Sequence, residues 1–121
     1  MPFTVSEHVS VSIIGMEWKF EGFDADGFER VFIEGDFDLY SSPSFAASLR
    51  RRMEQGSIRF RMDCSGVRYL DSSGVGVIIF ILQEMRKRGG ETRFRGLSGT
   101  ARKVLSLTNI LPLLREEGDR P

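Results

Sequence analysis

The sequence predicts a single α/β domain on a mixed β-sheet, with an N-terminal hairpin, mostly parallel strands after it, and about four helices. Three observations carry this prediction. The chain has 121 residues, enough for one hydrophobic core of its own. Two apolar segments flank a turn signal near residues 24–27. Strand and helix patterns then alternate, which is typical of parallel strands joined by right-handed crossovers.

The first third of the chain predicts strands. Residues 1–15 form an N-terminal extension, in which residues 9–13 alternate valine or isoleucine with serine and permit a short edge strand. The aromatic-rich residues 18–23 precede the turn signal Asp24-Ala-Asp-Gly27, and a second apolar segment covers residues 28–37. This order predicts a β-hairpin.

The first helix is expected to begin at Ser42, whose side chain would cap it, with Pro43 in the first helical position, and to end near Gly56. A cluster of arginines at residues 50–52 is interpreted as its last turn, where cations complement the exposed carbonyls. Its buried face is predicted to hold three apolar residues spaced four apart: Phe45, Leu49 and Met53.

A short strand over residues 58–63 and another over residues 92–95 are predicted to flank a second helix from about residue 72 to residue 88. Residues 77–82 of that helix are apolar nearly all round, which indicates burial against the sheet. The alternative is that Ile79 or Phe80 is partly exposed and joins a partner surface.

The last part of the chain predicts a third helix and a final turn. Ser98 can cap the helix, Asn109 is a plausible left-handed terminator, and residues 111–114 pack a last turn. The polar residues 115–121 are expected to fray, and residues 117–121 are placed outside the domain as a flexible tail. One apolar stripe is expected along the third helix: Ala101, Val104, Leu105 and Thr108.

Composition narrows the function classes. Seventeen basic residues balance seventeen acidic ones, so we expect no nucleic-acid partner. The single cysteine, Cys64, excludes an internal disulfide and gives no metal constellation, and no cofactor is expected. The N-terminus does not resemble a secretory signal, and the longest apolar stretch, residues 75–82, is far below the roughly 20 residues of a membrane span. Cytoplasm is the expected location.

Two polar segments follow strands of the predicted sheet. Gly35-Asp-Phe-Asp38 leaves the second hairpin strand, and residues 70–76 open the second helix. Because sites in α/β sheets form outside the carboxyl ends of the strands, both segments are expected at one edge. Either Asp71 or Ser72 caps the helix, which leaves the Ser73 hydroxyl uncommitted in the first turn. The glycines Gly74 and Gly76 would not obstruct approach, although capping and close packing alone also explain this motif.

Enzymatic functions fit the sequence poorly. A serine hydrolase needs a base, and the only histidine is His8, in the extension. No Gly-x-Ser-x-Gly motif surrounds Ser73. Four aspartates could suggest a Mg²⁺ site, but no phosphate-binding glycine loop with a lysine accompanies Asp36, Asp38, Asp63 and Asp71. The residues predict a binding protein that is a substrate of modification, not a catalyst.

Residues 16–116 resemble a STAS domain, the family of bacterial anti-sigma-factor antagonists and related regulatory modules. The resemblance covers Gly35-Asp-Phe-Asp38, then Met62-Asp-Cys-Ser-Gly-Val-Arg-Tyr-Leu-Asp-Ser-Ser-Gly-Val-Gly76, then Leu105-Ser-Leu-Thr-Asn-Ile110. It implies a mixed sheet with helices. Asn109 stands where glycine is usual, and residues 1–15 have no clear counterpart, which leaves both monomer and dimer open.

The resemblance also implies a function. In members switched by phosphorylation, a serine at the place of Ser73 is modified by a partner kinase that is also the anti-sigma factor, and acidic residues at the places of Asp38 and Asp71 flank it. We therefore expect an anti-sigma-factor antagonist that is switched off by phosphorylation on Ser73, with a serine phosphatase as a further candidate partner. The expected partner contacts are Asp38, Asp71, Ser72, Ser73 and Gly74. The alternative is an unphosphorylated STAS scaffold, a subunit of a signalling assembly or transporter complex.

Overall fold

The computed structural model describes residues 9–13 and 15–118. They form one six-stranded mixed sheet in which the strands follow one another in chain order. The two pairs at the N-terminal side are antiparallel, and the remaining three pairs are parallel. The elements are β1 (Val9–Ile13), β2 (Met16–Phe23), β3 (Glu29–Phe37), α1 (Ser42–Glu54), β4 (Arg59–Leu70), α2 (Ser72–Arg88), β5 (Glu91–Arg95), α3 (Gly99–Leu107), the 3₁₀ turn η1 (Leu111–Leu113) and β6 (Arg115–Glu116).

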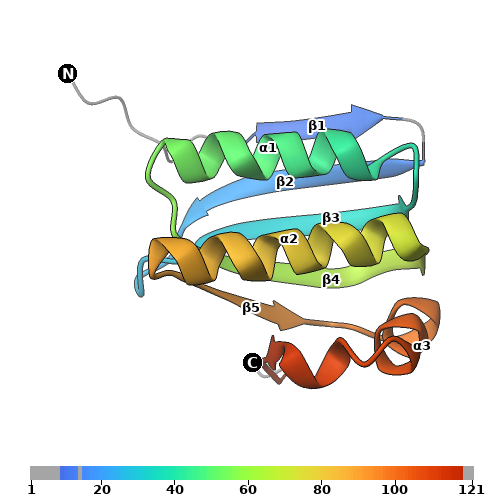
Figure 1. The fold of residues 1–121 in the computed structure, drawn as a ribbon. Helices are drawn as coiled ribbons and strands as arrows, with labels where there is room; N and C mark the ends of the chain where they lie inside the picture. The colour runs from blue at the N-terminus through green and yellow to red at the C-terminus, as the bar shows by residue number, and fades with distance from the viewer. Residues whose placement is uncertain (1–8, 14, 119–121) are drawn as a thin grey trace.

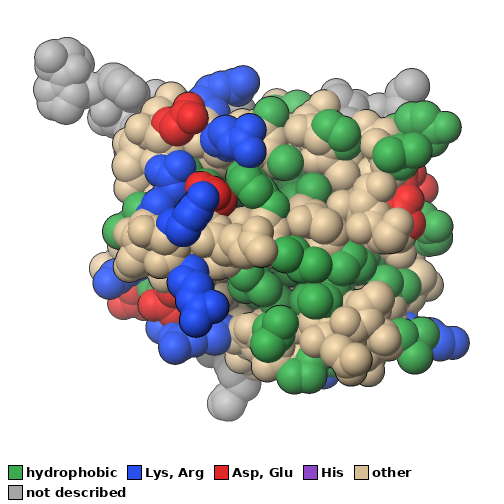
Figure 2. Space-filling view, in the orientation of Figure 1, with side chains coloured by type: hydrophobic (Ala, Val, Ile, Leu, Met, Phe, Trp, Pro, Cys, Tyr) green, Lys and Arg blue, Asp and Glu red, His purple; other side chains and the backbone are tan. Residues whose placement is uncertain are grey.

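Figure 1 shows α1 and α2 side by side across one face of the sheet, with α3 and η1 beyond β5. Burial alternates along the strands, as expected for a sheet covered on one face. The predicted apolar face of α1 is confirmed, because Phe45, Leu49 and Met53 are all buried. Both α1 and α2 carry basic residues in their last turns, and Figure 2 shows Lys and Arg gathered on the left of the helical layer, where these helices end.

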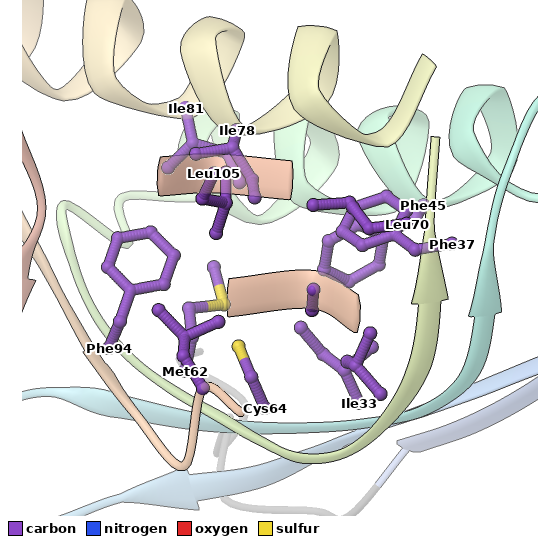
Figure 3. Close-up of a pocket in the computed structure, with 13 residues that line it drawn as sticks. Ile33, Phe37, Phe45, Met62, Cys64, Leu70, Ile78, Ile81, Phe94 and Leu105 are labelled. Carbon is purple, nitrogen blue, oxygen red and sulfur yellow. The ribbon is translucent and has the colours of Figure 1, made fainter. Parts of the chain in front are cut away.

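The core is closely packed. The Phe45 ring meets Trp18 and Phe37 edge to face, each with ring centroids 5.3 Å apart. Figure 3 shows a small void between the sheet and the helices, lined only by apolar side chains. Its volume of about 10 Å³ is too small and too apolar to hold even one water molecule stably. This cavity is a packing feature and has no room for a ligand.

The second helix follows its prediction closely. It spans Ser72–Arg88, and Val77, Ile78 and Ile81 are buried against the sheet. Ile79 and Phe80 are partly buried, and the Arg50 guanidinium lies 4.9 Å from the centre of the Phe80 ring. The two residues thus lie at the border between core and surface, and α1 covers part of that border.

The strand predicted over residues 58–63 is longer than expected. β4 continues to Leu70, because its second half pairs in parallel with the end of β3. The pairing has two register shifts, one between Asp63 and Gly66 and one between Val67 and Tyr69 of β4. As a result, β4 ends directly before Asp71.

The predicted cap at Ser42 is wrong by one residue. Ser41 is the N-cap of α1, and Ser42 is the first helical residue, buried with a hydroxyl that has no hydrogen-bond partner among the described residues. The Ser41 hydroxyl does not cap the helix either. It donates to the Asp36 carbonyl oxygen at 2.8 Å and accepts from the Asp38 N–H at 2.9 Å, so it stabilises the preceding loop.

Two expectations at the C-terminal side also change. Thr108 is exposed and does not join the apolar stripe of α3, because its hydroxyl donates to the Val104 carbonyl oxygen at 2.8 Å. Fraying from residue 115 is wrong, since Arg115–Glu116 forms β6 and Glu117 donates its N–H to the Phe94 carbonyl oxygen at 2.7 Å. The left-handed terminator is confirmed, with Asn109 at a φ of 61°.

Candidate functional site

The candidate site lies where two parallel strands end together. Phe37 of β3 and Leu70 of β4 are partners in register, so the segments after them leave the sheet at the same edge. The Asp71 N–H donates to the Phe37 carbonyl oxygen at 3.3 Å. The residues after β3 therefore lie against the start of α2, as the sequence predicts.

The Asp71 side chain joins the two segments. It is the N-cap of α2: its Oδ1 accepts the N–H of Ser73 at 2.8 Å and that of Gly74 at 3.2 Å. Its Oδ2 accepts the N–H of Leu39 at 3.2 Å. The capping role that the sequence left open between Asp71 and Ser72 thus belongs to Asp71, and the same carboxylate holds the loop after β3.

Asp38 stabilises its own loop. Its Oδ1 accepts the N–H of Tyr40 at 2.9 Å and that of Ser41 at 3.1 Å, which is an Asx-type turn. Asp38 stands between Phe37 and Leu39, both of which are hydrogen-bonded to Asp71. The structure therefore brings Asp38, Asp71 and the start of α2 together, and both carboxylates serve the local backbone.

The two serines differ in exposure but not in hydrogen bonding. Ser72 is exposed and Ser73 is half-buried. Within residues 9–13 and 15–118, neither hydroxyl has a hydrogen bond. Because Asp71 provides the cap, both hydroxyls stay uncommitted, and hydrogen bonding does not separate the two serines. The assignment of the switch to Ser73 depends on the family motif.

The two glycines of the motif have different surroundings. Gly74 is buried, and a Cβ placed there would lie 2.6 Å from the Phe37 carbonyl oxygen. Gly76 is exposed, and a Cβ there would have no heavy atom within 4 Å. Gly74 therefore allows α2 to pack on the end of β3, whereas Gly76 leaves an open surface on the first turns of the helix.

Large hydrophobic side chains surround this edge, and the sequence analysis missed them. Tyr40 is 80% exposed, Leu39 61% and Tyr69 46%. Figure 2 shows hydrophobic side chains beside acidic ones at the right-hand edge of the molecule, where α1 and α2 begin. The available signal was a leucine and a tyrosine between Asp38 and Ser41, in a segment whose other residues favour a turn.

Cys64 lies in the core, and burial raises the pKa of its thiol to about 12, so it stays protonated and unreactive. No three His, Cys, Asp or Glu side chains within the described part of the chain are arranged to hold a metal ion. In the same residues, no helix is long and apolar enough to cross a membrane.

A model of the STAS domain family matches residues 24–117. Together with the mixed sheet and the capped serine motif, this match defines the class of protein: the chain belongs to the STAS domain family. The chain is similar to the anti-sigma-B factor antagonist of Listeria monocytogenes, with 27% identity over 84 residues that cover 69% of this chain and 74% of the relative. Its similarity to anti-sigma factor antagonists, a regulatory and non-enzymatic group, indicates that it is not an enzyme.

Solved structures agree on the fold. The anti-sigma factor antagonist SpoIIAA in its unphosphorylated form superimposes with a TM-score of 0.64 at 22% identity, covering 74% of this chain and 81% of that one. A sulfate transporter family protein from Wolinella succinogenes gives a TM-score of 0.63 at 18% identity, covering 75% of each chain. The same fold thus occurs in an antagonist and in a transporter family protein.

Proposed function

We propose that this protein is a cytoplasmic anti-sigma-factor antagonist that binds an anti-sigma factor with serine kinase activity and is switched off by phosphorylation on Ser73. The observation that carries the proposal is the start of α2, where Asp71 caps the helix and the uncommitted Ser73 hydroxyl occupies the position that the family motif gives to the switch. The similarity to anti-sigma-B factor antagonists supports it. A serine phosphatase would reverse the modification.

The switch acts on the partner and leaves the fold intact. A phosphate on Ser73 adds a charge of about −1.5 to −2 at a helix N-terminus, where an anion is favoured by about 0.3–1 kcal/mol. In the complex the same dianion enters a packed interface beside Asp38 and Asp71. A loss of two to three decades in affinity needs about 3–4 kcal/mol, which one unpaired buried charge supplies.

The site of modification is tested with the anti-sigma-type serine kinases of the source genome, each purified and incubated with the full chain and ATP. Mass spectrometry should find one phosphate, on Ser73. Ser73→Ala should abolish the phosphorylation. Ser72→Ala is the matched control, because both hydroxyls are free in the same turn of the helix, and it should leave the phosphate on Ser73 in place. Phosphate on Ser72 or elsewhere would refute the assignment.

The effect on binding is measured by titration calorimetry. Ser73→Ala should bind the anti-sigma factor and become insensitive to its kinase activity. Ser73→Asp should bind more weakly, though less so than the phosphorylated protein, because it carries about half the charge. Equal affinity for both variants and the wild type would favour the second candidate, an unphosphorylated scaffold, which the likeness to the transporter family protein supports. Kinase and sigma-factor genes beside this gene favour the switch, and transporter genes favour the scaffold.

A further inference from the structure

We propose that Tyr40, with Leu39 beside it, is the apolar anchor by which the partner kinase docks around Ser73. The inference rests on the proposed function, because it commits to that kinase as the occupant. Tyr40 is 80% exposed and Leu39 61% exposed, so more than half of the surface of each residue is open to a partner. Tyrosine is among the residues that most often dominate the energy of an interface, because its large amphipathic ring is buried at little entropic cost.

The loop that carries these side chains is held in place. The N–H of Leu39 is bonded to Asp71 at 3.2 Å and the N–H of Tyr40 to Asp38 at 2.9 Å. The next N–H, that of Ser41, is also bonded to Asp38, at 3.1 Å. A loop that is ordered before binding loses less entropy when the partner covers it. Asp38 and Asp71 are therefore positioning residues that present the anchor.

The position of the loop identifies the occupant. A kinase that modifies Ser73 must enclose its hydroxyl, and a standard interface covers about 800 Å² on each partner. The Ser73 N–H and the Leu39 N–H are bonded to the two oxygens of one carboxylate, that of Asp71. Any contact of that size centred on Ser73 therefore includes the loop. Three aspartates, Asp36, Asp38 and Asp71, lie at this edge, and Arg68 pairs with Asp36 alone among them, at 3.7 Å. The complementary surface is therefore an apolar pocket with a basic rim.

The same geometry explains how the phosphate acts. Burying the Tyr40 ring removes water from the surface next to it, and Ser73 is joined to this loop through the Asp71 carboxylate. A dianion at Ser73 loses its hydration when the anchor is buried, so the modified protein cannot gain the binding energy of the anchor. The anchor and the charge are thereby coupled, and their effects on affinity are not additive.

The experiment compares the full chain and three variants by titration calorimetry against each anti-sigma-type serine kinase of the source genome, with a non-hydrolysable ATP analogue. Tyr40→Ala and Leu39→Ala should raise Kd by roughly ten- to a hundredfold. Leu113→Ala is the matched control, since Leu113 is 63% exposed but lines a groove with Arg86 and Gly90, at the other end of α2. Its Kd should stay at the wild-type value, and all variants should keep the wild-type melting temperature.

A second series uses protein phosphorylated on Ser73. There, Tyr40→Ala should change Kd by less than about threefold, because the anchor is no longer buried. If Tyr40→Ala and Leu39→Ala both bind with wild-type affinity while the kinase still phosphorylates Ser73, the anchor proposal is wrong and the proposed function remains. A loss in Leu113→Ala equal to that in Leu39→Ala would also overturn it. If the wild type binds none of the kinases, the inference and the proposed function fall together.

Discussion

Gly74 and Gly76 lie two positions apart in α2 and predict opposite responses to the same substitution. In Gly74→Ala the new methyl group would strike the Phe37 carbonyl oxygen, a backbone atom that also accepts the N–H of Asp71. We expect a loss of about 1–3 kcal/mol, the cost of overpacking a tight contact. Gly76→Ala meets open space in a helix and should gain about 0.5–1 kcal/mol.

Urea unfolding of both variants measures these changes, with the wild type as reference. Equal effects in the two variants would contradict the packing role of Gly74. Both glycines were predicted to leave approach unobstructed, with close packing as the alternative. Gly74 is closely packed against β3, whereas Gly76 faces open space. Sequence spacing places the two on the same helix, but which of them faces β3 depends on how α2 crosses the sheet, which a local pattern does not contain.

At the scale of elements, Asp71 holds the start of α2 with one carboxylate oxygen and the loop after β3 with the other. Two substitutions at this position can separate these roles. Asp71→Ala removes both interactions. The lost cap of α2 should lower the free energy of unfolding by about 0.5–2 kcal/mol, and the loop also loses its hydrogen bond at Leu39. Asp71→Asn keeps one acceptor for the cap, because asparagine caps helices as well as aspartate, but replaces the second oxygen with a donor.

Thermal melts and amide hydrogen exchange follow the two roles of Asp71. Asp71→Asn should melt close to the wild type while the Leu39 N–H loses protection, and Asp71→Ala should lose both. Protection at Leu39 that survives in both variants would show that Asp71 does not hold the loop. Asp38→Ala should act on the same loop through Tyr40 and Ser41, and should leave the cap of α2 intact.

Most elements could be predicted because each has a local cause. The turn at residues 24–27, the terminator Asn109 and the cap at the start of α2 are each specified by a few neighbouring residues. The second half of β4 and the short strand β6 could not be predicted, since they depend on pairing with β3 and β5. The same holds for the site: the motif indicates Asp38, Asp71 and Ser73, whereas the exposure of Tyr40 follows from the tertiary arrangement of two loops.

At the scale of the whole molecule, the sheet face away from α1 and α2 is held by ion pairs. Phe28 is buried there beneath the guanidinium groups of Arg61 and Arg93, 4.5 Å and 4.7 Å from the ring centre. Glu117 bonds both arginines, at 2.8 Å to Arg61 and 3.1 Å to Arg93, and Asp24 also pairs with Arg61. This network connects the hairpin turn, β4, β5 and the residue after β6. The C-terminal segment is therefore bonded directly to the parallel side of the sheet and, through Arg61, to the hairpin side.

The network makes stability depend on pH through Glu117. Hydrogen bonds from Arg61 lower the pKa of Glu117 below its ordinary value of 4.5, so its contribution to stability is present above pH 4.5 and is lost as the pH falls through the lowered pKa. Glu91 and Glu84 also have lowered pKa values, because Arg93 and Lys87 respectively bond them, and they act in the same direction. Burial raises the pKa of Glu29, so its contribution runs the other way: it is present at low pH and lost as the pH rises through the raised pKa.

Glu117→Gln tests this dependence. At pH 7 the variant should be less stable by up to about 1 kcal/mol, a drop of a few degrees in melting temperature, because the two arginines lose a charged partner. As the pH falls through the lowered pKa of Glu117, the wild-type carboxyl becomes protonated, so the two curves should approach each other. Glu34→Gln is the matched control, since Glu34 is exposed and makes no ion pair with the described residues. A difference between wild type and Glu117→Gln that stays constant as the pH falls through this titration would show that the charge of Glu117 does not stabilise the fold. The C-terminal segment would then be held by its other contacts, such as the pairing of β6 with β5 and the backbone bond of Glu117 to Phe94.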